Sequence, residues 1–282
     1  MAKFRLLFDL LRRQGFANPS ALHRPLPIAR RGLELVHPRS YHQAFARGEL
    51  GAAAQRRIGL PSTQPLVQRT WLSVGGTRLT ARLALQHGVA CHLAGGTHHA
   101  FADFGSGFCI FNDVAIAARV LLEEGVINQL MVVDLDVHQG DATARIFAGD
   151  DRVFTFSAHC TSNFPLHKQL SDLDIGLNDG LEDGDYLRAV GDQLPDLLDQ
   201  IKPDLVFYNA GVDPHRDDRL GRLCLSDAGL LNRDHLVLDA CLRRQIPVAT
   251  VIGGGYGDLD QLVRLHGLVF RAAAEQSRLH GI

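Results

Sequence analysis

Two adjacent histidines, His98 and His99, follow a Gly-Gly pair in the segment LAGGTHHAFADFGSGFC, residues 93–109. An unperturbed imidazole has a pKa of about 6.5, so a histidine can take up and release a proton near neutral pH. An isolated pair of this kind is more common in a solvated loop than in an active site. Here, however, four later segments of the chain also end in side chains that could take part in one reaction.

The sequence DLDVH, residues 134–138, contains a candidate pair of metal ligands, Asp136 and His138. In an extended chain, residues i and i+2 lie on the same face, so this carboxylate and this imidazole can bind one ion. Asp213, at the end of a later segment, can supply a third ligand. Three protein ligands and one open position are typical of a catalytic metal site, whereas a structural site is usually closed by four. In the alternative interpretation, Asp136 and His138 only cap a strand.

Zinc is the first candidate for this mixed nitrogen and oxygen set, and Fe²⁺, Co²⁺ or Mn²⁺ would also suit it. A water molecule activated at such a site needs a base, and the leaving group needs an acid, for which His98 and His99 are the candidates. A carboxylate commonly holds the far nitrogen of such an imidazole. Asp134 and Asp141 could do so, although Asp141 could instead cap a helix.

Tyr256 follows three consecutive glycines, residues 253–255. Glycine allows the backbone to turn sharply and to approach a ligand closely. A tyrosine hydroxyl group at this position could polarise a carbonyl group and donate a hydrogen bond to the oxyanion that forms. A phosphate-binding loop is the alternative, but the chain has no G-K-[ST] and no G-x-G-x-x-G at a strand–helix turn, so this alternative is weak.

Five short apolar segments should position these side chains. They are rich in Val, Ile, Leu or Phe without strict alternation, which is typical of strands buried on both faces of a parallel sheet. They span residues 88–96, 129–138, 152–159, 204–213 and 246–256. In open parallel sheets, ligands bind outside the carboxyl ends of the strands. We therefore expect a single active site at that edge of the sheet.

Helical patterns alternate with these segments, at residues 112–125, 184–201 and 226–245. Pro195 should break or kink the second of them. Strand and helix in alternation predict a doubly wound α/β fold, with residues 1–282 forming one domain. The first eighty or so residues are interrupted by prolines and should form short helices and loops. Their first apolar side chains fall on one helical face: Phe4, Leu7, Phe8 and Leu11.

The composition is that of an ordinary globular chain, with 46% apolar and 21% charged residues. A formal net charge of −2 gives no basic excess, which argues against nucleic-acid and membrane partners. Five cysteines without a C-x-x-C pair argue against a disulfide framework. We find no signal peptide and no segment long enough to span a bilayer, so we expect a cytoplasmic protein. The oligomeric state is left open.

Several motifs together resemble the zinc-dependent histone deacetylase superfamily, in particular its bacterial and class IV branch. They occur in the expected order from about residue 92 to residue 256: GGTHHAFADFGSGFCIFNDVAIA, VVDLDVHQGDATARIF, FTFSAHCTSNFP, NAGVDPHRDDRLGRLCLS and GGGY. The earlier segment VHPRSYHQAF, residues 36–45, resembles the family's VH-x-x-x-Y segment. The resemblance implies a single-domain, three-layer arginase/deacetylase-like α/β fold with a central parallel sheet of about eight strands.

The resemblance also implies two kinds of bound ion. Zn²⁺ would be held by Asp136, His138 and Asp213, with Fe²⁺ or Co²⁺ as alternatives. A structural K⁺ would be held by main-chain carbonyl groups around Asp134, Asp136 and His138, together with Ser157.

The catalytic roles implied by the resemblance fall on five side chains. His98 and His99 would be the catalytic pair, oriented by Asp134 and Asp141 respectively. Tyr256 would polarise the carbonyl group of the substrate.

For the substrate, the resemblance implies a narrow channel with Phe108 and Phe164 as its walls, and a contact from the carbonyl group of Gly107 to the substrate amide. A long, apolar and unbranched acyl-lysine stem fits such a channel. Gln139 stands where many members of the family have a second histidine, which fits the class IV branch.

The implied reaction is removal of an acyl group, acetyl or longer, from the ε-amine of lysine in a protein or peptide. Small acylated amines such as acetylpolyamines are the alternative substrate, and would favour acidic residues at the channel mouth. The acidic clusters of the chain are Glu182, Asp183, Asp185, Asp217 and Asp218. A two-metal ureohydrolase would need carboxylates in place of His98 and His99, and a metal-binding module without turnover would be expected to lose Tyr256 or a histidine.

Overall fold

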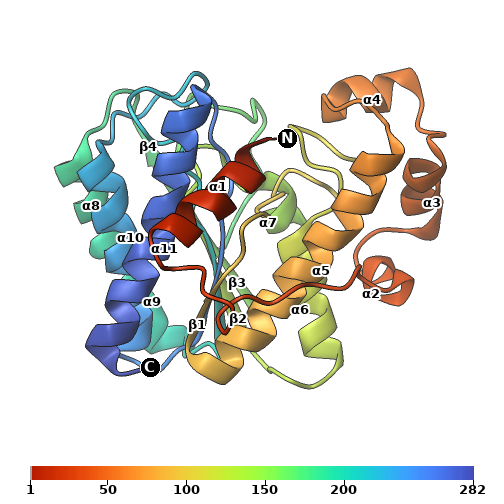
Figure 1. The fold of residues 1–282 in the computed structure, drawn as a ribbon. Coiled ribbons are helices and arrows are strands. Elements are labelled where there is room, and N and C mark those ends of the chain that lie inside the picture. Colours follow the sequence, from red (N-terminus) through yellow and green to blue (C-terminus); the bar gives the residue numbers. More distant parts are fainter. Residues whose placement is uncertain (1) are drawn as a thin grey trace.

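The computed structural model describes residues 2–282, which form one parallel sheet between two layers of helices (Figure 1). The strands are β1 (Val89–Cys91), β2 (Leu130–Asp134), β3 (Val153–Cys160), β4 (Leu173–Leu177), β5 (Leu205–Asn209) and β6 (Val248–Val251). They lie in the order β1-β6-β5-β2-β3-β4, and every neighbouring pair is parallel. The predicted three-layer α/β fold is confirmed.

The sheet has six strands in the described part of the chain, where the resemblance predicted about eight. The segments before β1 form helices and proline-rich connections instead of strands, and proline has no N–H group to donate to a strand ladder. Five strands coincide with the apolar segments of the sequence. The sequence analysis missed β4, because this edge strand is only partly buried and its sequence, LDIGL, has no continuous apolar run.

The helices of the described residues divide between the two faces of the sheet (Figure 1). They are α1 (Ala2–Arg13), α2 (Arg30–Glu34), α3 (Arg39–Arg47), α4 (Ala52–Ile58), α5 (Gln64–His87), α6 (Asp113–Glu123), α7 (Asp141–Phe147), α8 (Asp183–Gly191), α9 (Leu194–Ile201), α10 (Asp227–Leu242) and α11 (Leu259–His280). Met131 and Val133 of β2 pack into the core shared with α1 and α8–α11, whereas Leu130 and Val132 pack into the core shared with α5 and α6. This alternation is expected of a strand buried on both faces.

The prediction of short helices before residue 80 was wrong for α5, which has 24 residues. Pro65 lies in the first turn of this helix, where the backbone N–H group has no partner within the helix, so proline is tolerated there. The side chain of Thr63 caps the helix by accepting a hydrogen bond from the backbone N–H of Leu66 at 3.3 Å. The predicted break at Pro195 is confirmed, because α8 ends at Gly191 and α9 begins at Leu194.

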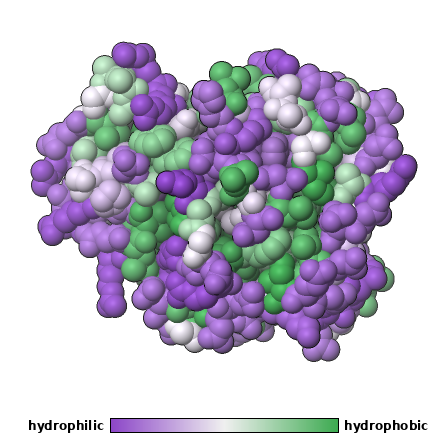
Figure 2. Space-filling view, turned by 180° about the vertical axis from the view of Figure 1, so that it is seen from behind, coloured by the Kyte–Doolittle hydropathy of each residue, from purple (hydrophilic) through white to green (hydrophobic). Residues whose placement is uncertain are grey.

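The parallel strands all have their carboxyl ends at the same edge of the sheet, and the loops that leave this edge carry the predicted site residues. The face opposite to that of Figure 1 has hydrophobic side chains near its middle, between hydrophilic margins (Figure 2). None of the described helices is both long and apolar enough to cross a membrane.

Candidate active site

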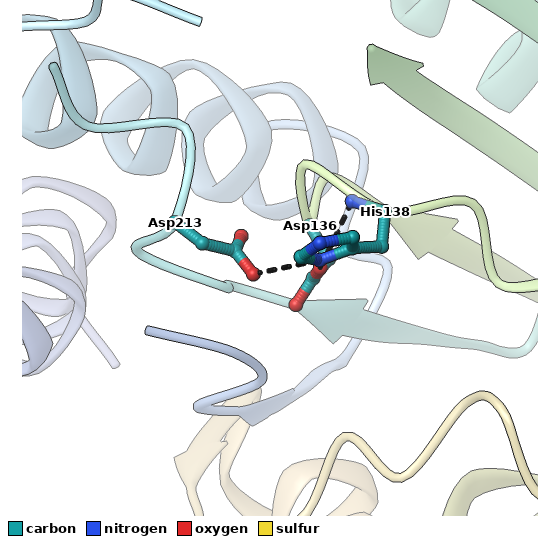
Figure 3. Close-up of side chains that lie close together, drawn as sticks. All are labelled: Asp136, His138 and Asp213. Atoms are coloured by element: carbon teal, nitrogen blue, oxygen red, sulfur yellow. Dashed lines mark hydrogen bonds and ion pairs between the residues drawn. The ribbon is translucent and has the colours of Figure 1, made fainter. Parts of the chain in front are cut away.

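Asp136, His138 and Asp213 lie together at the carboxyl edge of the sheet (Figure 3). Asp136 and His138 follow β2, and Asp213 follows β5, which is a neighbour of β2 in the sheet. Their candidate ligand atoms all lie within 4.8 Å of one another. Nδ1 of His138 lies 3.1 Å from Oδ1 of Asp136 and 3.1 Å from Oδ2 of Asp213. The three side chains thus converge on one point, as a shared ion requires.

Backbone amides fix the other oxygens of the two carboxylates. The N–H of Val137 donates to Oδ1 of Asp213 at 2.8 Å, and the N–H of Gly254 donates to Oδ2 of Asp136 at 2.7 Å. A Cβ atom at Gly254 would lie only 2.2 Å from Oδ2 of Asp213. Glycine is therefore required at this position, because the loop after β6 passes directly against both carboxylates.

The charge of this cluster favours a cation. Asp136 and Asp213 are both 0% exposed, and within the described residues neither forms an ion pair with lysine or arginine. Burial alone lowers the pKa of His138, but its hydrogen bonds to Asp136 and Asp213 outweigh burial and raise the pKa to about 10. Buried carboxylates are costly unless they are paired or coordinate a metal. Two oxygen donors and one nitrogen donor fit a divalent ion.

Each histidine of the adjacent pair is held by its own carboxylate. Nδ1 of His98 lies 2.7 Å from Oδ2 of Asp134, and Nδ1 of His99 lies 2.7 Å from Oδ1 of Asp141. The two ring centroids are 4.1 Å apart, and all four side chains are buried. Asn209, at the end of β5, donates from Nδ2 to Oδ1 of Asp134 at 2.9 Å. The predicted pairs are thus brought together in the predicted combination, although their catalytic role stays a prediction.

The two imidazoles lie in different electrostatic environments. Burial alone lowers the pKa of His98, but the charges of Asp134 and Asp136 outweigh it and raise the pKa to about 9. Burial and the charge of His98 together lower the pKa of His99 to about 4. Near neutral pH the environment therefore favours a protonated His98 and a neutral His99.

The turn that carries the histidines is fastened to α6 through Asp113, which the sequence analysis did not single out. This carboxylate is 1% exposed and accepts the backbone N–H groups of Gly96 at 3.2 Å and Thr97 at 2.8 Å. It also accepts the hydroxyl groups of Thr77 and Thr97, each at 2.5 Å. Because Thr97 directly precedes His98, Asp113 fixes the start of the segment that carries the two histidines.

Gly107 and Phe108 form the tip of a tight turn that Ser106 and Cys109 close with two backbone hydrogen bonds of 3.0 and 2.8 Å. Both tip residues have positive φ angles, 51° and 63°, as a type I′ turn requires. A phenylalanine in this conformation is uncommon, and such strain is concentrated at functional sites. A Cβ atom at Gly107 would lie 2.8 Å from Cδ2 of His99, so only glycine allows the turn to approach the histidine.

Aromatic side chains lie close to the imidazole rings of His99 and His138. The ring of Phe164 is 4.8 Å from that of His99 and 6.5 Å from that of His138. The ring of Tyr256 is 5.9 Å from those of Phe108 and His138. Burial, together with the nearby carboxylates, raises the pKa of Tyr256, so its hydroxyl group stays protonated and can donate a hydrogen bond.

A cavity of about 380 Å³ lies beside these residues. The predicted site residues in its lining are His98, His99, Gly107, Phe108, Asp136 and Tyr256. The lining also includes Lys3 of α1, whose ammonium group lies 3.3 Å from Nε2 of His266. Burial lowers the pKa of Lys3 to about 8. Phe164 is not part of this lining and adjoins it through His99.

The residues predicted for K⁺ come from adjacent strands. Asp134 of β2 is paired in register with Ser157 of β3, and both are buried. The hydroxyl group of Ser157 lies 3.0 Å from Nδ1 of His159. The K⁺ site itself stays a prediction.

Arg233 of α10 contacts the two loops that carry the candidate metal ligands and was missed by the sequence analysis. It is 1% exposed, and its guanidinium group donates to the carbonyl groups of Leu135 at 3.2 Å and Gly211 at 2.7 Å. Leu135 precedes Asp136 directly. No motif could have revealed this contact, because Arg233 follows an unremarkable helical pattern nearly a hundred residues after Leu135.

The family model described as the histone deacetylase domain matches residues 1–273 of the chain. An uncharacterized protein of Picosynechococcus sp. is 55% identical over 276 residues, which are 98% of this chain and 92% of that protein. Histone deacetylase 2 of Arabidopsis thaliana is 30% identical over 252 residues, or 86% of this chain, which spans 65% of the plant protein's length. The acetoin utilization protein AcuC of Staphylococcus aureus is 30% identical over 244 residues, 78% of this chain and 62% of AcuC.

Among solved structures, a histone deacetylase homologue of Aquifex aeolicus superimposes with a TM-score of 0.83 at 24% identity, over 97% of this chain and 77% of that one. A homologue complexed with SAHA gives a TM-score of 0.82 at 23% identity, over 98% of this chain and 77% of that one. These similarities establish the fold.

The matching family model, together with the fold and the polar cluster at the carboxyl edge of the sheet, places the chain among the hydrolases. The chain belongs to the histone deacetylase family, as the motifs of its sequence indicated.

Proposed function

We propose that this protein is a metal-dependent deacylase that hydrolyses the amide bond of an acyl-lysine, acetyl or longer, in a protein or peptide. The observation that carries the proposal is the pair of carboxylate-bound histidines beside the buried Asp136, His138 and Asp213 cluster. Membership of the histone deacetylase family supports hydrolysis of an acylated amine. A ureohydrolase is disfavoured, because imidazoles occupy the positions where bridging carboxylates would be needed.

The histidines move protons. Because Asp134 and Asp141 engage Nδ1 of His98 and His99, Nε2 of each ring is the atom that exchanges a proton with water or substrate. We assign to His99, which is neutral near pH 7, the uptake of a proton from the attacking water and its transfer to the departing amine. The hydroxyl group of Tyr256 donates a hydrogen bond to the oxyanion. A Zn²⁺ ion, or another divalent ion, held by the Asp-His-Asp cluster would polarise the amide carbonyl group as a Lewis acid.

The remaining residues bind the substrate. Phe108 and Phe164 enclose the apolar stem of the acyl-lysine, and the carbonyl group of Gly107 accepts the substrate N–H. A structural K⁺ near Asp134 and Ser157 would stabilise the loop after β2.

The experiment uses lysine peptides that carry acetyl, octanoyl or myristoyl groups and release a fluorophore on deacylation. The wild-type protein and Tyr256→Phe are compared after loading with Zn²⁺. We expect turnover of one acyl class, and a loss of about 10²–10³ in rate for the variant. Acetylpolyamines are measured in parallel, and turnover of these amines without turnover of any peptide would refute a polypeptide substrate.

A further inference from the structure

The loop between β3 and β4, residues 161–172, displays apolar side chains beside the active site. We call this segment the rim loop. Its Phe164 lies against His99, with ring centroids 4.8 Å apart. Leu166 and Leu170 are each 88% exposed, more than any other large apolar side chain of the described residues. Leu166 is two residues from Phe164, which is a distance of at most about 7 Å along the chain.

A lysine side chain fixes the first half of the rim loop. The ammonium group of Lys168 donates to the carbonyl groups of Thr161 at 3.1 Å, Asn163 at 2.6 Å and Pro165 at 2.6 Å. These three bonds close the loop around one charged donor. The exposed leucines therefore project from a constrained backbone.

Gln139, the residue after the metal-ligand candidate His138, fixes the second half. This side chain is 1% exposed, and its amide donates to the carbonyl group of Gln169 at 2.7 Å and accepts the N–H of Gln169 at 2.9 Å. It also donates to Asp174 at 2.8 Å. The position at which the chain departs from the family's second histidine thus ties the rim loop to the metal-ligand segment.

The rim loop is also bonded to the backbone of a segment that carries a further exposed leucine. Asn163 donates from Nδ2 to the carbonyl group of Leu220 at 2.6 Å and accepts the N–H of Arg222 at 3.0 Å. Leu220 is 46% exposed. Exposed apolar side chains that gather in one place mark interaction sites, whereas scattered ones do not.

The charges around this surface do not favour a polyamine. The rim loop contains one acidic residue, Asp172, which accepts the backbone N–H and the hydroxyl group of Thr155, and one lysine, Lys168. Asp218 accepts the backbone N–H groups of Leu220 and Gly221, each at 2.8 Å, and of Tyr256 at 2.7 Å, so this carboxylate is engaged within the protein. Asp179, which accepts the hydroxyl group of Ser162, is paired with Arg222, so a cationic small amine would meet apolar side chains and carboxylates that already have partners at the rim loop.

We propose that Leu166 and Leu170 form a docking surface for an apolar side chain that neighbours the acyl-lysine in a polypeptide substrate. This inference rests on the proposed deacylase function and names the residues that select the polypeptide. The surface adjoins the active site through Phe164, and a residue one or two positions from the acyl-lysine lies within about 7 Å of it along an extended peptide. Small acylated amines have no such side chain and gain nothing from the leucines.

The test compares two acetyl-lysine peptides that differ only in the residues flanking the lysine, which are leucine in one and serine in the other. Binding is measured by fluorescence anisotropy, and turnover is measured separately. For the wild type we expect about tenfold tighter binding and a correspondingly lower KM for the leucine peptide. In the double variant Leu166→Ser/Leu170→Ser this ratio should fall below about twofold. Leu279→Ser, which changes a 76% exposed leucine of α11, should keep the tenfold ratio.

Equal binding of the two peptides to the wild type, or an undiminished ratio in the double variant, would overturn the docking surface. Preferential binding of the leucine peptide without turnover would leave the surface intact and count against the deacylase function alone. Sedimentation velocity tests whether the leucines instead mediate self-association. A wild-type dimer that the double variant converts to a monomer would assign the leucines to contacts between two copies of the chain, and the docking proposal would be wrong.

Discussion

The hydroxyl group of Thr97 donates a hydrogen bond to Oδ1 of Asp113 at 2.5 Å, and the backbone N–H of Thr97 donates to the same oxygen at 2.8 Å. Asp113 is the first residue of α6, and Thr97 is the residue before His98. The contact therefore links a rigid helix to the turn that carries both site histidines. Hydrogen bonds to a charged group are among the stronger ones in proteins.

Replacement of Thr97 by valine should destabilise the protein by about 1.5–3 kcal/mol, because a hydrogen bond to a buried carboxylate is lost. It should also lower kcat, since the histidine turn is no longer fixed. Urea unfolding and peptide turnover measure the two effects. Thr80→Val is the matched control, because among the described residues the hydroxyl group of Thr80 bonds only the carbonyl group of Gly76 within α5. This variant should cost about 0.5–1.5 kcal/mol without a change in kcat. Equal effects on kcat in the two variants would refute the positioning role.

Tyr256→Phe should leave metal binding intact and slow hydrolysis by about 10²–10³, the usual loss for one oxyanion donor. The raised pKa of Tyr256 implies that the hydroxyl group remains a donor at all working pH values. Tyr41→Phe is the control, since its hydroxyl group donates to the carbonyl group of Ile110 at 2.7 Å and should affect stability alone. A wild-type rate in Tyr256→Phe would remove the tyrosine from the mechanism.

The ligand cluster could be predicted because its residues follow apolar strands immediately. Asp136 is two residues beyond the end of β2, and Asp213 is four residues beyond the end of β5, so the sheet itself determines where they lie. The pairing of His98 with Asp134 was implied by the family resemblance, whereas the parallel order by itself predicts only that their segments meet at one edge of the sheet.

Other contacts could not be predicted, because they depend on how loops fold back on the sheet. The bond between Thr97 and Asp113 connects a turn to a helix start, and no periodicity determines that approach. Gln139 offered a signal, since an amide follows a metal ligand, but its partner Gln169 lies in an irregular loop. Strand β4 was missed for a similar reason, as a partly exposed edge strand lacks the apolar run of a central one.

Addition of Zn²⁺ should raise the melting temperature, because an ion that binds only the folded chain stabilises it by mass action. At a metal concentration about 100-fold above the dissociation constant, we expect an increase of about 5–10 °C in differential scanning fluorimetry. Asp213→Asn should abolish the shift. The control Asp196→Asn, which changes an exposed acid of α9, should retain it. Retention of the full shift in Asp213→Asn would place the ion elsewhere.

His37 should make the protein less stable in mild acid. Its Nδ1 donates to the carbonyl group of Ala102 at 2.8 Å, and its Nε2 accepts the N–H of Asn112 at 3.0 Å, which requires the neutral ring. Burial lowers the pKa of His37 to about 4. The unfolded chain, with a pKa of about 6.5, binds more protons between these values, so stability is complete above about pH 6.5 and falls toward pH 4.

Between about pH 7.5 and about pH 5, His37 should therefore contribute about 2 kcal/mol to the loss of unfolding free energy. Urea unfolding of the wild type and of His37→Gln at both pH values isolates this contribution from that of other buried histidines. The variant will be less stable at neutral pH but should lose about 2 kcal/mol less on acidification. Equal losses in the two proteins would show that His37 is not held neutral.

Arg233 should control metal affinity without contacting the metal. Its guanidinium group joins the carbonyl groups of Leu135 and Gly211, and so connects the two loops that carry the carboxylate ligands. Its charge is balanced by Asp234, which is 2.8 Å away and 2% exposed. Removal of Arg233 alone would leave a buried carboxylate without its partner, at a cost of about 3–5 kcal/mol. In a single variant, a loss of metal affinity could therefore not be separated from a loss of folding stability.

The double variant Arg233→Met/Asp234→Leu removes both charges, and replacement of a buried ion pair by apolar side chains is often close to neutral for stability. We expect it to fold, and to bind Co²⁺ about 10–100-fold more weakly, the usual effect of losing a group that orients metal ligands. Chelator competition followed by Co²⁺ absorbance gives the affinity, and urea unfolding gives the stability. A stable double variant with wild-type Co²⁺ affinity would contradict the positioning role, since the two ligand loops would then hold their geometry without the arginine.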